Sequence, residues 1–99
     1  MATYFNYAAI QNTVSGNGIV SCTTFNGGSS TLTIELDVGI FNRPGRYVVV
    51  KSTNAITNPP TGYAVSFVGG TSLLNVKSAA RETVPFSTGA FDCITVTIG

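Results

Sequence analysis

Two acidic side chains have a spacing that could support acid–base chemistry. Glu35 and Asp37 are two residues apart in a segment that alternates like a strand, so both carboxylates project from one face, about 7 Å apart. Paired acids at such a separation occur in inverting glycosidases. Alternation along a half-solvated strand also places acids on the solvent face without any catalytic need. We interpret the pair in this second way.

The sequence contains no histidine and only two cysteines, Cys22 and Cys93. The absence of histidine removes the commonest general base and zinc ligand, and it leaves neither thiol with a histidine that would activate it. Two cysteines are too few for a four-cysteine zinc site. We therefore predict no enzymatic activity, no metal ion and no cofactor. Cys22 and Cys93 are interpreted as small buried side chains, with a disulfide between them left open.

The basic residues are concentrated at one predicted turn. Arg43 and Arg46 bracket Pro44 and Gly45, and Lys51 follows in the next strand. Two guanidinium groups at a turn can bind carboxylates of a partner, so both arginines are candidate interface residues. The net charge of +1 gives no electrostatic attraction to nucleic acid or to a membrane. We expect neither as a partner.

The composition favours a neutral, polar β-domain. Of 99 residues, 14 are Thr, 11 Gly, 9 Ser and 8 Asn, and only 9% are charged, against about 25% in typical soluble domains. β-Branched residues suit a pleated surface and disfavour helix. The length suits a single domain over residues 1–99, and no signal peptide or membrane span is visible. Residues 1–10 are predicted to be an ordered arm or an edge strand.

Alternating hydrophobicity, interrupted by Gly, Asn and Pro turns, indicates several strands. We predict an all-β fold: a small antiparallel β-sandwich or β-barrel of six to eight strands. Strands are expected at residues 18–25, 31–41, 46–52, 63–69, 72–77 and 93–98, and a short helical turn at 76–82. The expected core consists of Leu32, Ile34, Leu36, Val38, Val48, Val50, Val65, Phe67, Ile94 and Val96.

The Ser/Thr/Asn/Gly-rich, charge-poor composition and the ending Ile94-Thr95-Val96-Thr97-Ile98-Gly99 resemble the small β-rich proteins of tailed-phage virions. The resemblance is to capsid decoration or cement proteins in particular. It implies a non-enzymatic structural protein that is made in the host cytoplasm, forms a homo-oligomer such as a trimer, and stabilises a capsid shell in the virion. No binding residue is carried over from that resemblance, because it has no diagnostic motif.

Self-association also has a physical basis in the sequence. A small β-domain with few Lys and Glu residues has strand edges that lack charged protection. We expect Tyr4, Phe5, Tyr7 and Phe91 to contribute to an interface, together with the two arginines. The alternative function is a carbohydrate- or receptor-binding module of a phage tail or surface protein. Its sugar-stacking rings would be Tyr63 beside Pro59 and Pro60, and Phe25 beside Asn26.

Overall fold

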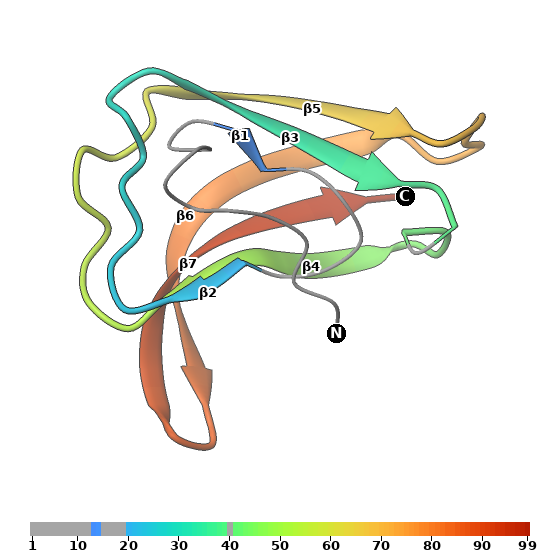
Figure 1. Cartoon of the computed structure of the whole chain (residues 1–99). Helices are drawn as coiled ribbons and strands as arrows, with labels where there is room; N and C mark the ends of the chain where they lie inside the picture. The colour runs from blue at the N-terminus through green and yellow to red at the C-terminus, as the bar shows by residue number, and fades with distance from the viewer. Residues whose placement is uncertain (1–12, 15–19, 40) are drawn as a thin grey trace.

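The computed structural model describes residues 13–14, 20–39 and 41–99, which form seven strands and no helix (Figure 1). The all-β prediction is confirmed for this part of the chain. The predicted arm at residues 1–10 lies outside the described residues. The strands are β1 (Thr13–Val14), β2 (Val20–Cys22), β3 (Thr31–Asp37), β4 (Gly45–Ser52), β5 (Gly62–Val68), β6 (Val76–Phe86) and β7 (Gly89–Ile98).

The strands form two sheets, with the orders β1-β3-β5 and β2-β4-β7-β6. From β1 to β5 the chain alternates between the sheets, so that β3 and β5 are parallel, as are β2 and β4. The predicted purely antiparallel arrangement is therefore wrong. The two strands of each parallel pair are separated in sequence by a strand of the other sheet. Such a crossover connection returns the chain to the first sheet in the same direction, so the two strands are parallel. Among the described strands only β6 and β7 form a hairpin, and these strands do not close into a barrel.

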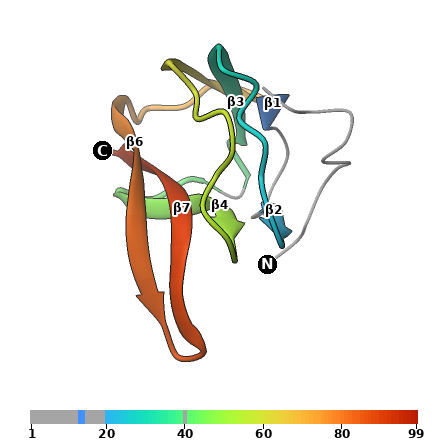
Figure 2. The same ribbon diagram turned by 90° about the vertical axis from the view of Figure 1, so that its left-hand side faces the viewer.

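One hydrophobic core lies between the two sheets (Figures 1 and 2). Leu32, Ile34 and Leu36 alternate along β3 and are buried, as the period of a half-buried strand predicts. Val65 and Phe67 of β5 pack against this core while partly buried. The facing sheet and the loops contribute the remaining core residues, which are Phe25, Phe41, Val49, Val50, Ile56, Ile94, Val96 and Ile98.

A β-bulge explains the apolar run at Val48, Val49 and Val50. Val48 pairs with Thr95 and Val50 pairs with Ile94, so Val49 is an extra residue in β4. Val49 and Val50 are both fully buried. Val48 was predicted to be a core residue, but it is not part of the core cluster. The same correction applies to Val38, which follows the end of β3.

The helical turn predicted at residues 76–82 is wrong, because these residues belong to β6. β6 pairs with β7 over its whole length, and Val76 and Ala79 pack against the core. Helix propensity is a weak preference that such tertiary contacts override. Residues 72–75, predicted as a strand, lie in the loop before β6.

Two loops, residues 23–30 and 53–61, run side by side next to the core (Figure 2). The Gly27 amide donates to the Thr57 carbonyl oxygen at 2.8 Å, and the Thr57 amide donates to the Phe25 carbonyl oxygen at 2.9 Å. A Cβ at Gly27 would lie 2.5 Å from Pro60 Cδ, so only glycine allows this approach. The paired loops hold Ile56 at the base of the β6–β7 hairpin, where its amide meets Asp92.

Candidate functional site

The β6–β7 hairpin extends away from the two sheets and is the most prominent feature of the molecule (Figures 1 and 2). The last residue pair between β4 and β7 is Ser52 with Asp92. Beyond it, residues 89–91 of β7 pair only with β6, through Val84, Pro85 and Phe86. The hairpin closes at Ser87 and Thr88. In the distal part of the hairpin, β7 therefore has hydrogen-bonded pairing with β6 alone. Side chains that pack on one face of the hairpin add further support.

The concave face is the side of the four-stranded sheet that faces away from the core. Two phenylalanine rings lie at its corner, where the hairpin bends. The rings of Phe86 and Phe91 meet edge to face, with centroids 5.3 Å apart. Lys51 Nζ lies 4.2 Å from the Phe86 centroid and 4.4 Å from that of Phe91. This double cation–π contact, about 0.5–2 kcal/mol in proteins, anchors β4 to the hairpin.

Cys93 lies on the concave face and yet is fully buried. By strand alternation it is on the same side as Phe91, opposite the core residue Ile94. Burial raises the pKa of the Cys93 thiol, and the Asp92 carboxylate raises it further, against smaller effects of Lys51 and the Val84 amide. The thiol is a poor nucleophile here, because the reactive species is the thiolate. Cys22 and Cys93 are both free, and only Cys93 is completely buried.

The burial of Cys93 gives a direct test of the concave face. Phe91 is the same-face neighbour of Cys93 on β7, so replacing Phe91 with alanine should expose the Cys93 thiol, which should then react with a thiol reagent faster than in the wild-type protein. In the wild type we expect Cys22, which is half-buried, to react first. Mass spectrometry of peptides after timed alkylation measures both rates, and Cys22 is the internal control. Equal Cys93 rates in the two proteins would show that the ring does not cover the thiol.

A charged pair lies farther along the concave face. Arg46 of β4 forms a salt bridge with Glu82 of β6, and the Thr95 hydroxyl donates to the same carboxylate. β4 and β6 pair with opposite edges of β7, so the Arg46–Glu82 salt bridge spans β7 at Thr95. Beside it is a groove of about 240 Å³, with Val48, Val84 and Pro85 among its lining residues. Apolar side chains therefore line the groove next to the Arg46–Glu82 ion pair, whose two charges offset each other.

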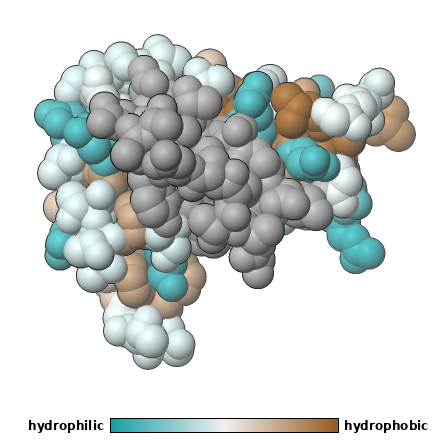
Figure 3. Space-filling view, in the orientation of Figure 1, coloured by the Kyte–Doolittle hydropathy of each residue, from teal (hydrophilic) through white to brown (hydrophobic). Residues whose placement is uncertain are grey.

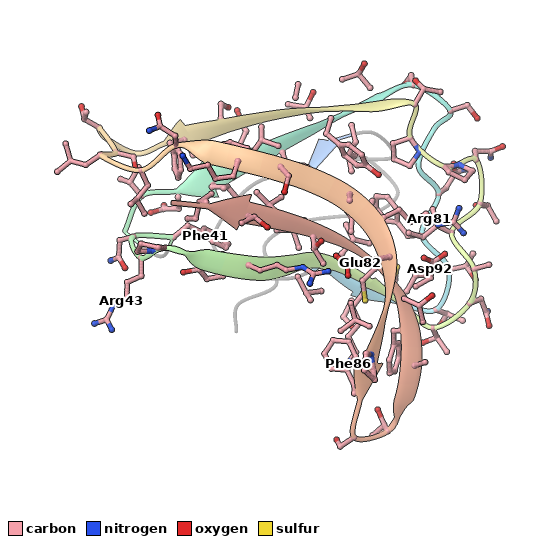
Figure 4. All side chains as sticks on the ribbon, turned by 180° about the vertical axis from the view of Figure 1, so that it is seen from behind. Phe41, Arg43, Arg81, Glu82, Phe86 and Asp92 are labelled. Carbon is pink, nitrogen blue, oxygen red and sulfur yellow. The ribbon has the colours of Figure 1, made fainter. Side chains whose placement is uncertain are left out.

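A second ion pair lies on the opposite, convex side of the hairpin. Arg81 Nε donates to both Asp92 carboxylate oxygens, at 3.1 and 3.0 Å, and Arg81 Nη2 donates at 2.7 Å. The Ile56 amide donates to Asp92 at 2.7 Å. Burial acts to raise the pKa of Asp92, but the hydrogen bonds from Arg81 and Ile56 outweigh it and the pKa is lowered. Figure 4 shows Arg81 and Asp92 at the base of the hairpin.

The predicted site residues are only partly brought together. Arg46 and Phe91 both lie on the concave face. Arg43 is exposed in the loop after β3, at the end of the molecule away from the hairpin (Figure 4). Tyr4, Phe5 and Tyr7 lie outside the described residues.

The remaining candidates, Asp37, Phe25 and Tyr63, contribute to a turn or to the core. Asp37 accepts a hydrogen bond from the Gly39 amide at 2.7 Å and stabilises the turn after β3. Phe25 is 1% exposed, which contradicts its suggested role in sugar stacking, and Tyr63 packs against the core. No group of three or more potential metal-ligating side chains occurs within residues 13–14, 20–39 and 41–99.

Arg81, Glu82, Phe86 and Asp92 were not identified from the sequence, and Lys51 was noted only as a basic residue near the two arginines. The signal that could have revealed the hairpin is the turn-forming Ser87-Thr88-Gly89 between two runs that contain β-branched and aromatic residues. The coloured part of the surface in Figure 3 is largely pale or teal, with hydrophobic areas at the upper right and at the lower left. Six of the nine charged residues of the chain are part of the hairpin or in contact with it, namely Arg46, Lys51, Lys77, Arg81, Glu82 and Asp92.

A scan against known protein families, a search of curated proteins and a search of solved structures each give no match to this chain.

Proposed function

We propose that the chain is a non-enzymatic structural protein of a virion that decorates and stabilises a capsid shell. The β6–β7 hairpin would provide the contact with the shell. The observation that carries this proposal is the projecting hairpin, whose paired rings Phe86 and Phe91 pack on each other and on Lys51 instead of on the core. Aromatic side chains of this kind are enriched at protein interfaces.

Three further features support a binding role over a catalytic one. Three charged residues of the hairpin form ion pairs: Glu82 pairs with Arg46 of β4, and Arg81 pairs with Asp92. The thiol of the hairpin, that of Cys93 in β7, is buried and has a raised pKa. The groove on the concave face has a volume of about 240 Å³, below the roughly 300–1,000 Å³ of typical small-molecule sites.

We also infer that the two sheets form the layers of a small β-sandwich. The single buried cluster contributed by β3 and by the facing strands β4 and β7 supports this architecture. A rigid two-layer body would hold the hairpin at a fixed angle, and a fixed angle lowers the entropic cost of binding. In this proposal the protein is made in the host cytoplasm and resides on the assembled virion as a homo-oligomer.

Replacing both Phe86 and Phe91 with alanine should weaken binding to the shell at least tenfold, because the aromatic contact surface is lost. The measurement is co-sedimentation of the full-length protein with shells assembled from the major capsid protein of the same genome. Wild-type binding should change little between low and high salt, since the contact surface carries few unpaired charges.

Two control variants locate the effect. Leu73→Ser removes an apolar side chain that is 97% exposed in the loop before β6, far from the hairpin tip, and should bind like the wild type. The double variant with Glu35→Gln and Asp37→Asn should also bind normally, because these acids lie on β3. Wild-type protein that does not sediment with the shells, or a double-alanine variant that binds as tightly as the wild type, would contradict the proposal. Glycan binding without shell binding would support the carbohydrate-binding alternative.

A further inference from the structure

We propose that two copies of the chain associate through the outer edge of β6, in antiparallel register about a two-fold axis at Thr83. Their two four-stranded sheets would then form one continuous sheet. The pairing concerns an edge of the hairpin and not its concave face, and it requires no shell. It can therefore fail without affecting the shell-binding proposal, and the reverse also holds.

The register of β6 against β7 determines which backbone groups point outward. Asn75 and Gly99 exchange two backbone hydrogen bonds, at 2.9 and 3.0 Å. In an antiparallel pair, hydrogen-bonded residues alternate with residues whose amides point away from the partner strand. Counting back along β7 from Gly99, the pairs that involve Thr97, Thr95, Cys93 and Phe91 are hydrogen-bonded. Their partners on β6 are Ser78, Ala80, Glu82 and Val84.

The intervening residues of β6 therefore direct their backbone groups to the outer edge. These residues are Ala79, Arg81, Thr83 and Pro85. Pro85 supports the assignment, because a proline is accepted in a strand where its missing amide would have faced away from the ladder. No described strand pairs with this edge of β6.

Only the hairpin half of this edge is accessible. The first half of β6 lies beside β5, and Tyr63 of β5 is close enough to Arg81 to interact with it electrostatically (Figure 1). From Arg81 to Phe86 the hairpin has no described strand on its outer side (Figure 2). An unpaired row of backbone donors and acceptors of this kind is a template for a further strand.

A two-fold axis at Thr83 satisfies the exposed groups. Thr83 would exchange two hydrogen bonds with the partner's Thr83, and the Arg81 amide would donate to the carbonyl oxygen of the partner's Pro85. The symmetric counterpart of each bond forms as well. The missing amide of Pro85 leaves only the Arg81 carbonyl oxygens unpaired, at the two ends of the interface, where water can reach them.

The charges of the edge favour a second copy as the occupant. Arg81 is neutralised by Asp92 and Glu82 by Arg46, within the same chain. In the two-fold register Arg81 lies opposite the partner's Pro85, and Glu82 lies opposite the partner's Val84, so no like charges face each other. Residues 83–86 carry no charge, and the net charge of the chain is only +1. Two identical edges can thus approach without the repulsion that usually protects edge strands.

The test is the association constant of purified protein without shells, measured by sedimentation equilibrium. Thr83→Pro removes an outward amide and should weaken dimerisation at least tenfold, while the β6–β7 ladder remains, as it does around Pro85. The control is Thr83→Val, which keeps the amide and should dimerise like the wild type. Pro85→Thr supplies the missing donors and should tighten the dimer.

Circular dichroism identifies a variant that fails to fold, and if Thr83→Pro does so, the Pro85→Thr result decides. A wild-type protein that is monomeric at high micromolar concentration would overturn the proposal. So would a folded Thr83→Pro variant that dimerises like the wild type, or a Pro85→Thr variant with unchanged affinity.

Discussion

Replacing Ile34 with alanine is expected to lower the free energy of unfolding by about 2–5 kcal/mol, the usual cost of truncating a buried isoleucine. Ile34 is fully buried in β3, the central strand of its sheet, and pairs with Val65 of β5. Small domains have total stabilities of about 5–15 kcal/mol, so the variant should be largely or partly unfolded near physiological temperature.

Urea denaturation followed by circular dichroism measures this effect. The matched control is Leu73→Ala, because Leu73 is 97% exposed and its truncation should change stability by no more than about 0.5 kcal/mol. An Ile34→Ala variant with the wild-type midpoint and slope would contradict the assignment of the core between the sheets.

Replacing Asp92 with alanine is expected to cost about 1–3 kcal/mol, because the Ile56 amide loses its acceptor. Arg81 loses its partner too, but its side chain is 38% exposed and the exposed ion pair adds little. The loop that carries Ile56 should then detach from the base of the hairpin. Asp92→Asn is the control, since its amide oxygen can still accept from Ile56 and most of the stability should remain.

The lowered pKa of Asp92 also predicts how stability depends on pH. A carboxyl group with a lower pKa in the folded state stabilises the fold above its unfolded pKa, and this contribution is lost as pH falls through the folded pKa. Wild-type stability should therefore decrease below about pH 4. Thermal denaturation between neutral pH and pH 2 should show a shallower decrease for Asp92→Asn. The same acid dependence in both proteins would show that Asp92 does not contribute in this way.

The strands with regular alternation were predictable from the sequence, and those with local irregularities were not. Residues 31–41 include β3 because Leu32, Ile34 and Leu36 repeat with the period of a strand. The bulge at Val49 breaks that period, so the burial of Val49 and the exclusion of Val48 from the core could not be read from the pattern. Phe41 and Ile56 are buried from loops, where no periodicity exists to reveal them.

The site was less predictable than the fold because its contacts join distant residues. Lys51 meets Phe86 and Phe91 only because β4 and β6 are both neighbours of β7. The Val-Lys-Ser-Ala-Ala-Arg-Glu segment at residues 76–82 has the composition of a helix, and its pairing with β7 depends on the hairpin turn that follows. Parallel pairing in both sheets likewise depends on crossovers that leave no local signal.

Electron cryo-microscopy of shells incubated with the protein gives the most direct view of shell binding through the hairpin. We expect added density on the shell surface in which the concave face, marked by Phe86, Phe91 and Lys51, contacts a capsid subunit. A map in which the β6–β7 hairpin points into solvent while another surface contacts the shell, or in which the shells carry no added density, would contradict the proposed function.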